Sequence, residues 1–279
     1  MKIDSARPLG TLFGRLGLGL LAVVVLSVCA ATSPVFGGSS LNATEKMMWS
    51  TYPLGTPKGM ATGFAIGRRD AHAPGGVAPV VITSVHVLET IGRGPFLVGA
   101  RMTDAAGQPK LALIRLQPPR GRERFYVRHP QHDLAAFELP IPAEAMRVAK
   151  LPLFLDEKAF AGRNDPLRAG AEVSFLGFPD VMPGTSDAFP ILRSGKVASY
   201  PVGPSNTQGY FLIDADVYPG DSGAPVFRTG RGGRPILAGV VLRRVGRNQR
   251  AFSHLAIAVE ANVIHETLDL LAASKANAR

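Results

Sequence analysis

Short runs of apolar and β-branched residues, separated by Gly, Pro and Asp, recur along most of the chain. Runs of this kind at regular spacing are typical of the strands of antiparallel barrels. The pattern predicts two sets of strands on either side of a proline-rich stretch. The first set covers 62–67, 79–88, 95–101, 110–116, 124–128 and 134–139, and the second covers 171–178, 191–200, 209–215, 224–228, 235–243 and 252–258.

The pattern changes near the C-terminus, where Val263, Ile264, Leu268 and Leu271 recur at the spacing of a helix face. We therefore expect a helix over 261–273. The prolines of residues 140–170 mark a crossover between the two strand sets. The predicted domain boundaries are a first barrel over 59–145, a crossover over 146–170, a second barrel over 171–260 and a C-terminal helical segment over 261–279.

The first thirty residues have a different pattern. Three basic residues precede an uncharged apolar run over 16–31, which is typical of an export signal. Its sixteen residues fall short of the roughly 20 that span a membrane as a helix. We expect a signal peptide over 1–30 cleaved after Ala30, followed by a linker and N-terminal arm over 31–58. An uncleaved membrane anchor through 16–31 and a lipoprotein modified at Cys29 are the alternatives, and the protein is expected to be periplasmic or secreted.

The amino-acid composition limits the binding partners that we expect for this protein. Cys29 is the only cysteine, so no intrachain disulfide can form and the fold relies on its apolar core. The formal charge of +10 is spread over stretches in which basic and apolar residues alternate, as on strands with one solvated face. We therefore expect no nucleic-acid binding, and anionic components of the cell envelope as partners besides protein or peptide substrates. His129 and His132 lie in a non-helical setting, and we expect neither a metal nor a cofactor.

One segment of the sequence contains a candidate catalytic residue. Residues 220–223 read Gly-Asp-Ser-Gly and lead into an apolar run. A serine on a tight turn between glycines can expose its hydroxyl while the backbone N–H groups point at the space beside it, as a nucleophile with an oxyanion hole requires. Because a serine alone is a weak nucleophile, Ser222 needs a base and a carboxylate from elsewhere in the chain.

Two residues fit these roles. His86 is predicted at the C-terminal end of the buried strand within 79–88, and Asp133 opens the strand 134–139. The order His, Asp, Ser, at separations of 47 and 89 residues, differs from the orders found in α/β-hydrolases and in subtilisins. Alone, each of these residues would more often have a structural role, but the ordered set predicts a catalytic triad.

The segments 83–87 (Thr-Ser-Val-His-Val), 133–135 (Asp-Leu-Ala) and 220–225 (Gly-Asp-Ser-Gly-Ala-Pro) resemble the three signature segments of trypsin-like serine peptidases. Residues 62–66, 177–179 and 194–199 resemble further segments of the bacterial members. The resemblance implies an exported bacterial peptidase that is similar to an HtrA protease core without a PDZ domain. It also implies the chymotrypsin-like, all-β fold of two antiparallel six-stranded β-barrels with a C-terminal helix.

The resemblance implies the roles as well. Ser222 would be the nucleophile of a serine endopeptidase, His86 the base, and Asp133 the residue that orients the imidazole. The backbone N–H groups of Gly220 and Ser222 would form the oxyanion hole. A binding or scaffolding module without catalytic activity is the alternative on the same fold.

Substrate preference stays open. Asp216 lies six residues before Ser222, where family members that cleave after Arg or Lys carry an aspartate, yet 214–215 also resembles the Asp-Ala of HtrA-type peptidases. Residues 239–244 resemble the strand that lines the specificity pocket. There Leu242 is followed by Arg243 and Arg244, which would narrow the pocket, select an acidic side chain or face solvent. The sequence does not decide whether the site needs activation.

Overall fold

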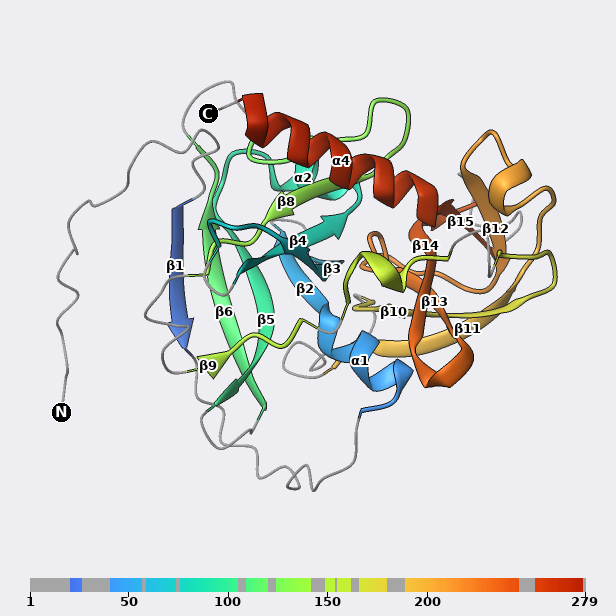
Figure 1. The fold of residues 1–279 in the computed structure, drawn as a ribbon, viewed down its shortest axis with the longest axis horizontal. Coiled ribbons are helices and arrows are strands. Elements are labelled where there is room, and N and C mark those ends of the chain that lie inside the picture. The colour runs from blue at the N-terminus through green and yellow to red at the C-terminus, as the bar shows by residue number, and fades with distance from the viewer. Residues whose placement is uncertain are drawn as a thin grey trace, which may run out of the picture.

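In this computed structural model, two β-structures pack against each other and one long helix runs across both (Figure 1). The structure describes residues 21–26, 41–56, 59–73, 76–104, 109–119, 124–141, 149–153, 155–161, 166–179, 189–245 and 254–277. The expected signal segment therefore lies outside the described residues except for 21–26, and so do residues 31–40 of the expected linker.

The first β-structure is a nine-stranded sheet whose strands pair in the order β1-β6-β5-β2-β3-β4-β8-β7, with β9 beside β5. These strands are β1 (Leu21–Leu26), β2 (Thr51–Thr56), β3 (Gly59–Arg69), β4 (Val77–Thr83), β5 (Phe96–Asp104), β6 (Pro109–Gln117), β7 (Val127–Arg128), β8 (Ala135–Glu138) and β9 (Ala149–Lys150). The predicted strand 124–128 shortens to two residues, while β2 forms where only an arm was expected. Among the described residues, the strands at the two ends of this order do not pair with each other, so the sheet is open.

The N-terminal arm is more ordered than its sequence pattern indicates. Helix α1 (Ala43–Ser50) begins at Asn42, whose side chain accepts from the Glu45 amide while the Glu45 carboxylate accepts from the Asn42 amide. This reciprocal capping box satisfies amide groups that a helix start leaves without partners. Strand β2 follows at once and buries Tyr52 and Leu54. Pro53 between them obscures the alternation, because proline is rare inside sheets.

The second β-structure is the six-stranded closed barrel that the sequence predicts. Its strands close in the order β10-β11-β12-β15-β14-β13. They are β10 (Glu172–Gly177), β11 (Ile191–Val197), β12 (Tyr210–Asp214), β13 (Pro225–Thr229), β14 (Pro235–Arg244) and β15 (Leu255–Glu260). Phe175, Phe211 and Val241 are among the side chains that fill its interior. Short 3-10 turns η2 (Glu157–Ala159), η3 (Gly203–Ser205) and η4 (Arg231–Gly233) lie in the connections, η2 within the expected crossover.

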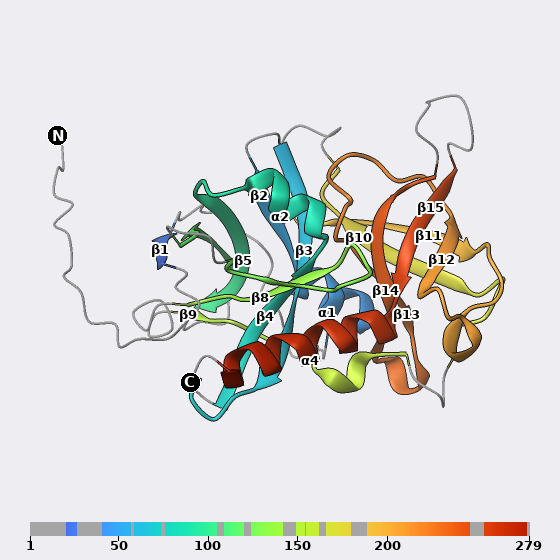
Figure 2. The ribbon, with the colours of Figure 1, turned by 90° about the horizontal axis from the view of Figure 1, so that it is seen from above.

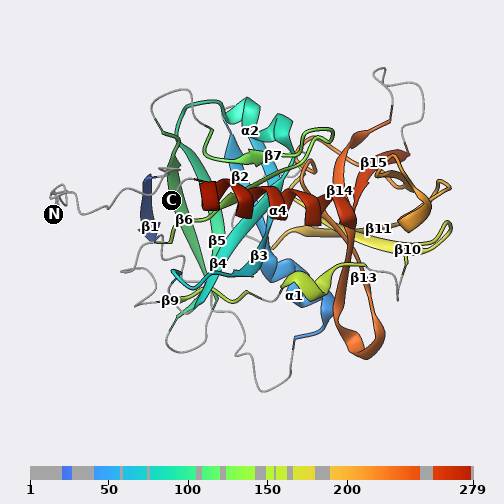
Figure 3. The ribbon, with the colours of Figure 1, turned by 45° about the horizontal axis from the view of Figure 1, so that its top comes forward.

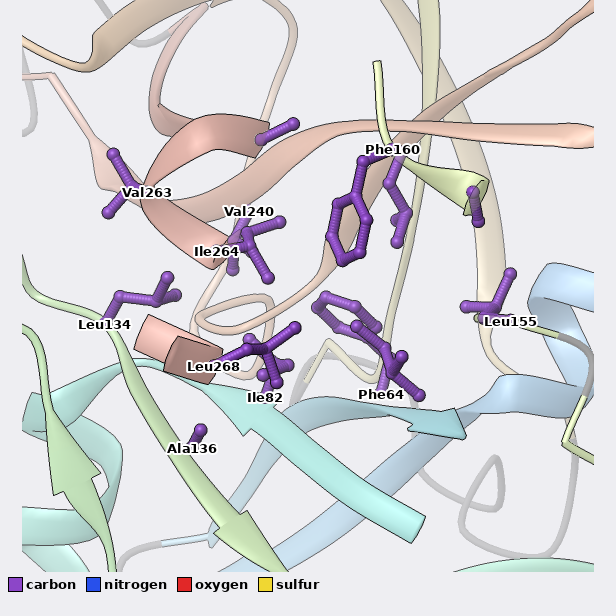
Figure 4. Packing of buried hydrophobic residues seen from close by; sticks show 14 of the residues in the cluster. Phe64, Ile82, Leu134, Ala136, Leu155, Phe160, Val240, Val263, Ile264 and Leu268 are labelled. Carbon is purple, nitrogen blue, oxygen red and sulfur yellow. The ribbon is translucent and has the colours of Figure 1, made fainter. Parts of the chain in front are cut away.

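A third apolar core joins the two β-structures. It combines Phe64 and Ile82 of the first sheet, Phe160 of the crossover and Val240 of the barrel (Figure 4). Helix α4 (Ala261–Asn277) covers this core with the apolar face that the sequence predicts: Val263, Ile264, Leu268 and Leu271 are all buried. Figures 2 and 3 show α4 lying across both units, beside β8 at one end and β14 at the other.

No helix in the described part of the chain is long and apolar enough to cross a membrane. Residues 21–26 of the apolar N-terminal run form β1, which pairs with β6 from Leu21 opposite Gln117 to Leu26 opposite Ala112.

Candidate active site

His86 lies in a short helix and not at the end of a strand, so the expectation of a strand over 79–88 is wrong beyond Thr83. Strand β4 ends there, Ser84 is the N-cap residue, and α2 (Val85–Ile91) carries His86 in its first turn. Within α2, the side chains of Val85, Leu88 and Ile91 are buried at helical spacing. Serine before this spacing is a helix-start signal, whereas the β-branched residues of the segment suggest a continuing strand.

Asp133 lies directly before β8, as predicted, in a loop that His129 shapes. The buried His129 ring accepts the amide N–H groups of Gln131 and His132 at its Nδ1, at 3.2 and 3.1 Å. Its Nε2 therefore carries the proton and donates to Glu266 of α4 at 3.0 Å. The backbone N–H of His129 donates to the Leu134 carbonyl at 2.8 Å. The loop that presents Asp133 is thus fastened to the C-terminal helix.

Helix α2 and the loop before β8 bring His86 and Asp133 together. His86 Nδ1 lies 2.6 Å from Asp133 Oδ2, and the His86 backbone N–H donates to Oδ1 at 3.0 Å. The N-cap residue Ser84 makes no side-chain hydrogen bond, so the Asp133 carboxylate takes its place and accepts a backbone N–H from the first turn of α2. Burial raises the pKa of Asp133, but the hydrogen bonds from His86 and from the Val85 backbone, with the charge of His86, outweigh it and leave the pKa below its usual range. The carboxylate is therefore ionised and fixes the imidazole with Nε2 directed away from it.

Ser222 lies on the turn 218–223, which we call the oxyanion turn. The Asp221 amide donates to the Tyr218 carbonyl at 3.0 Å, and the Gly223 amide donates to Val241 at 2.9 Å. Among the described residues, the amides of Gly220 and Ser222 have no acceptor, and Gly220 adopts a φ of 98°. Two free backbone donors beside a serine are the elements of an oxyanion hole.

The Ser222 hydroxyl donates to the Leu242 carbonyl at 2.9 Å, and it makes no hydrogen bond to His86 in the described structure. Catalytic hydrogen bonds in ligand-free enzymes are often long or differently aligned and tighten when substrate binds. Rotation of the Ser222 side chain about its Cα–Cβ bond changes the acceptor of this hydroxyl without moving the backbone.

Thr62 of β3 fastens the oxyanion turn to the first sheet. Its side-chain hydroxyl donates to the Gly220 carbonyl at 2.7 Å and accepts from the Phe178 amide at 3.0 Å. Its backbone N–H donates to the Ser222 carbonyl at 3.1 Å. The space beside this contact is closed: a Cβ at Gly223, whose φ is 89°, would lie 2.0 Å from the Thr62 carbonyl oxygen. Sequence reasoning used Thr62 only as part of a resembling segment and missed its role.

The residues proposed for specificity lie around this turn with different partners. Asp216 is 44% exposed and lies 2.8 Å from Nδ1 of the exposed His254. Leu242 is buried and offers its carbonyl to Ser222. Arg243 is exposed and Arg244 partly exposed on the same strand, where the pairing with β15 shifts register at Val241/Arg243.

Asp133 and Arg243 both influence Tyr210. Burial raises the pKa of Tyr210, and the negative charge of Asp133 adds to this rise while the positive charge of Arg243 opposes it. The charges of Asp133 and Arg243 therefore act in opposite directions on the pKa of Tyr210. In the part of the chain that the structure describes, no group of three or more His, Cys, Asp or Glu side chains is placed to hold a metal ion.

Comparison with solved structures returns chains of low sequence identity. A mutant of Rv3671c from M. tuberculosis in its inactive form is 18% identical, with a TM-score of 0.47, over 89% of this chain and 98% of that one. Kallikrein-related peptidase 10 is 16% identical with a TM-score of 0.47, over 82% and 98%. The serine protease of a human pathogenic astrovirus is 14% identical with a TM-score of 0.42, over 76% and 90%. No curated protein sequence matches significantly.

The family is shown by sequence. The profile of the trypsin-like peptidase domain matches residues 61–236, which is more than half of the 279 residues. This range includes His86, Asp133 and Ser222. The chain belongs to the family of trypsin-like peptidase domains.

Proposed function

We propose that this protein is a serine endopeptidase that uses His86, Asp133 and Ser222. The Ser222 Oγ attacks the carbonyl carbon of a peptide bond while His86 Nε2 takes its proton. The oxyanion receives the N–H groups of Gly220 and Ser222, and His86 returns the proton to the leaving amine, which gives an acyl-enzyme. Water, deprotonated by the same imidazole, then hydrolyses the ester and restores the Ser222 hydroxyl. Asp133 holds the imidazole and stabilises its positive charge.

Two observations support this proposal. His86 Nδ1 lies 2.6 Å from Asp133 Oδ2, and the amides of Gly220 and Ser222 on the serine turn have no acceptor among the described residues. Neither feature is needed to close the barrel or to fill the core. A binding module without activity would retain the fold but would not need the paired imidazole.

A peptide library analysed by mass spectrometry tests peptide-bond hydrolysis and specificity together. The proposal expects cleavage by the wild type and none by Ser222→Ala. Cleavage after Arg or Lys would support Asp216 as the selecting group, and cleavage after Asp or Glu would support Arg243 and Arg244. A folded wild type that cleaves nothing in a diverse library would favour the binding module.

We also propose export, on the evidence of the N-terminal pattern. Cleavage after Ala30 would remove β1 and leave β6 as an edge of the sheet, since β6 pairs with β1 on one side and β5 on the other. The intact mass of protein recovered from the producing cells distinguishes the outcomes. Loss of residues 1–30 supports a signal peptide, retention supports an anchor, and a lipid mass on Cys29 supports a lipoprotein.

A further inference from the structure

Asp133 lies in a short hairpin loop between β7 and β8, which pair with each other. Beyond the last strand pair, the His129 N–H donates to the Leu134 carbonyl at 2.8 Å and closes the loop. Residues 130–133 lie between these two ends, and both strands lie beside α4. The direction of the Asp133 carboxylate therefore depends on the conformation of this loop.

The buried ring of His129 holds the loop from its inner side. Its Nδ1 accepts the N–H groups of Gln131 at 3.2 Å and of His132 at 3.1 Å, so this nitrogen carries no proton. A proton on Nδ1 would add a third donor at a point where two backbone donors already meet. The observed loop therefore requires one particular neutral tautomer of His129, with the proton on Nε2.

Glu266 provides the acceptor that this tautomer needs. The His129 side chain is only 4% exposed, and its Nε2 lies 3.0 Å from Glu266 Oε2. The hydrogen bond made by one nitrogen of an imidazole sets the protonation of the other. Ile264 and Thr267, on either side of Glu266 in α4, are fully buried, so the helix holds the carboxylate in a fixed place.

Ring contacts extend this support to the residue next to Asp133. The centre of the His132 ring lies 4.6 Å from that of His129 and 4.7 Å from that of Tyr210, where β12 begins. A Cβ built on Gly209 would lie 2.9 Å from His132 Cε1. His132 is therefore enclosed between its own loop and the second barrel, and Asp133 follows it directly in the chain.

We propose that Glu266 and His129 are positioning residues for the catalytic Asp133. Glu266 keeps the proton of the His129 ring on Nε2. The free Nδ1 then holds the two loop amides, and the loop directs the Asp133 carboxylate at His86. Both residues act through Asp133 and not on the reacting atoms. This inference rests on the proposed peptidase function, and it makes separate predictions about the ring and the loop.

The first test is the rate at which a fluorophosphonate labels Ser222, which does not depend on substrate specificity. In His129→Ala the loop amides lose their acceptor, and we expect labelling to slow about 100-fold, the scale of a 1 Å misplacement in an active site. Glu266→Ala keeps the ring but removes the acceptor that sets its tautomer, so labelling should slow about 10-fold. Glu266→Gln should recover most of this loss, because its amide oxygen still accepts from Nε2. Asp269→Ala, which removes an 82% exposed carboxylate from the same helix, is the matched control and should label as the wild type does.

Replacement of His129 by asparagine separates positioning from packing. An asparagine side chain can accept the backbone N–H two residues on without a partner in α4. His129→Asn should therefore label faster than His129→Ala, although it too leaves part of the space of the ring unfilled. In the His129→Asn background, Glu266→Ala should have no further effect.

Two outcomes of this comparison would overturn the proposal. A role in packing alone would make His129→Asn as slow as His129→Ala. A role of Glu266 in the stability of α4 alone would slow labelling equally in the wild-type and His129→Asn backgrounds. The comparison of the two backgrounds holds even if His129→Ala does not fold.

Nuclear magnetic resonance of isotope-labelled histidine tests the tautomer independently of catalysis. In the wild type, the His129 proton should be on Nε2, and in Glu266→Ala this preference should weaken. Hydrogen exchange at the Gln131 and His132 amides should be faster in Glu266→Ala and unchanged in Asp269→Ala. A folded wild type that takes no label would contradict the proposed function and leave these measurements valid. A proton on Nδ1 of His129 in the wild type, or unchanged loop exchange in Glu266→Ala, would overturn the positioning role.

Discussion

Thr62→Val removes one hydroxyl and keeps nearly the same shape. That hydroxyl makes two hydrogen bonds, to the Gly220 carbonyl and from the Phe178 amide, and Thr62 and Phe178 are both buried. A buried donor or acceptor left without a partner costs about 1–3 kcal/mol. Since Gly220 is only partly buried and can recover a water molecule, we expect a total loss of about 2–4 kcal/mol in the free energy of unfolding.

Thr267→Val is the matched control. Thr267 is also fully buried, but its hydroxyl makes one bond, at 2.7 Å, to the carbonyl four residues earlier in α4. That carbonyl keeps its place in the helix ladder, so the control should lose about 1 kcal/mol or less. Urea denaturation gives both values, with the fluorescence of Trp49 as the signal, because Trp49 is the only tryptophan and is 4% exposed.

The two variants should also differ in reactivity. Thr62→Val loosens the Gly220 carbonyl, so its fluorophosphonate labelling should slow by about 10- to 100-fold, less than after deletion of an oxyanion donor. Thr267→Val should label normally. Equal losses of stability in the two variants, with normal labelling of Thr62→Val, would refute the view that Thr62 fastens the turn to the first sheet.

Two other predictions follow from the same site. Gly223→Ala should lower the free energy of unfolding by more than about 3 kcal/mol or prevent folding, because the φ of 89° is unfavourable for alanine and the new Cβ would lie 2.0 Å from the Thr62 carbonyl oxygen. Gly232→Ala, with a φ of 75° and open space around the position, should lower it by only about 1–2 kcal/mol in the same urea assay. Similar losses would contradict the close contact. Because the folded pKa of Asp133 is lowered, its ionised form stabilises the fold above the ordinary pKa of about 3.9, and this contribution disappears as the pH falls through the folded value. The difference in unfolding free energy between wild type and Asp133→Asn should therefore shrink in acid, and a difference that grows there would contradict the pairing with His86.

The fold could largely be predicted from periodicity, and the exceptions have local causes. All six strands of the second barrel and the helix face of α4 follow from alternation and helical spacing. The change from β4 to α2 did not, because Val85 and Val87 suit a strand while the capping position of Ser84 and the burial of α2 favour a helix. Strand β2 could not be predicted because Pro53 interrupts its pattern, and α1 could not be predicted because its capping signal is short.

The candidate site was predictable only for residues with distinctive chemistry. His86, Asp133 and Ser222 stand out by type and order, and the contact between the first two agrees with that order. Thr62 does not stand out, because a threonine in a strand is an ordinary residue. Its significance depends on a contact with a residue 158 positions away, which only the packed fold reveals.

The most direct test of the central claim is the reaction of the folded protein with a fluorophosphonate, followed by intact-mass measurement and peptide mapping. The triad predicts one adduct per chain, located on Ser222, with no adduct in Ser222→Ala and much slower labelling in His86→Ala. A folded wild type without an adduct, or a Ser222→Ala variant labelled as fast as the wild type, would contradict it.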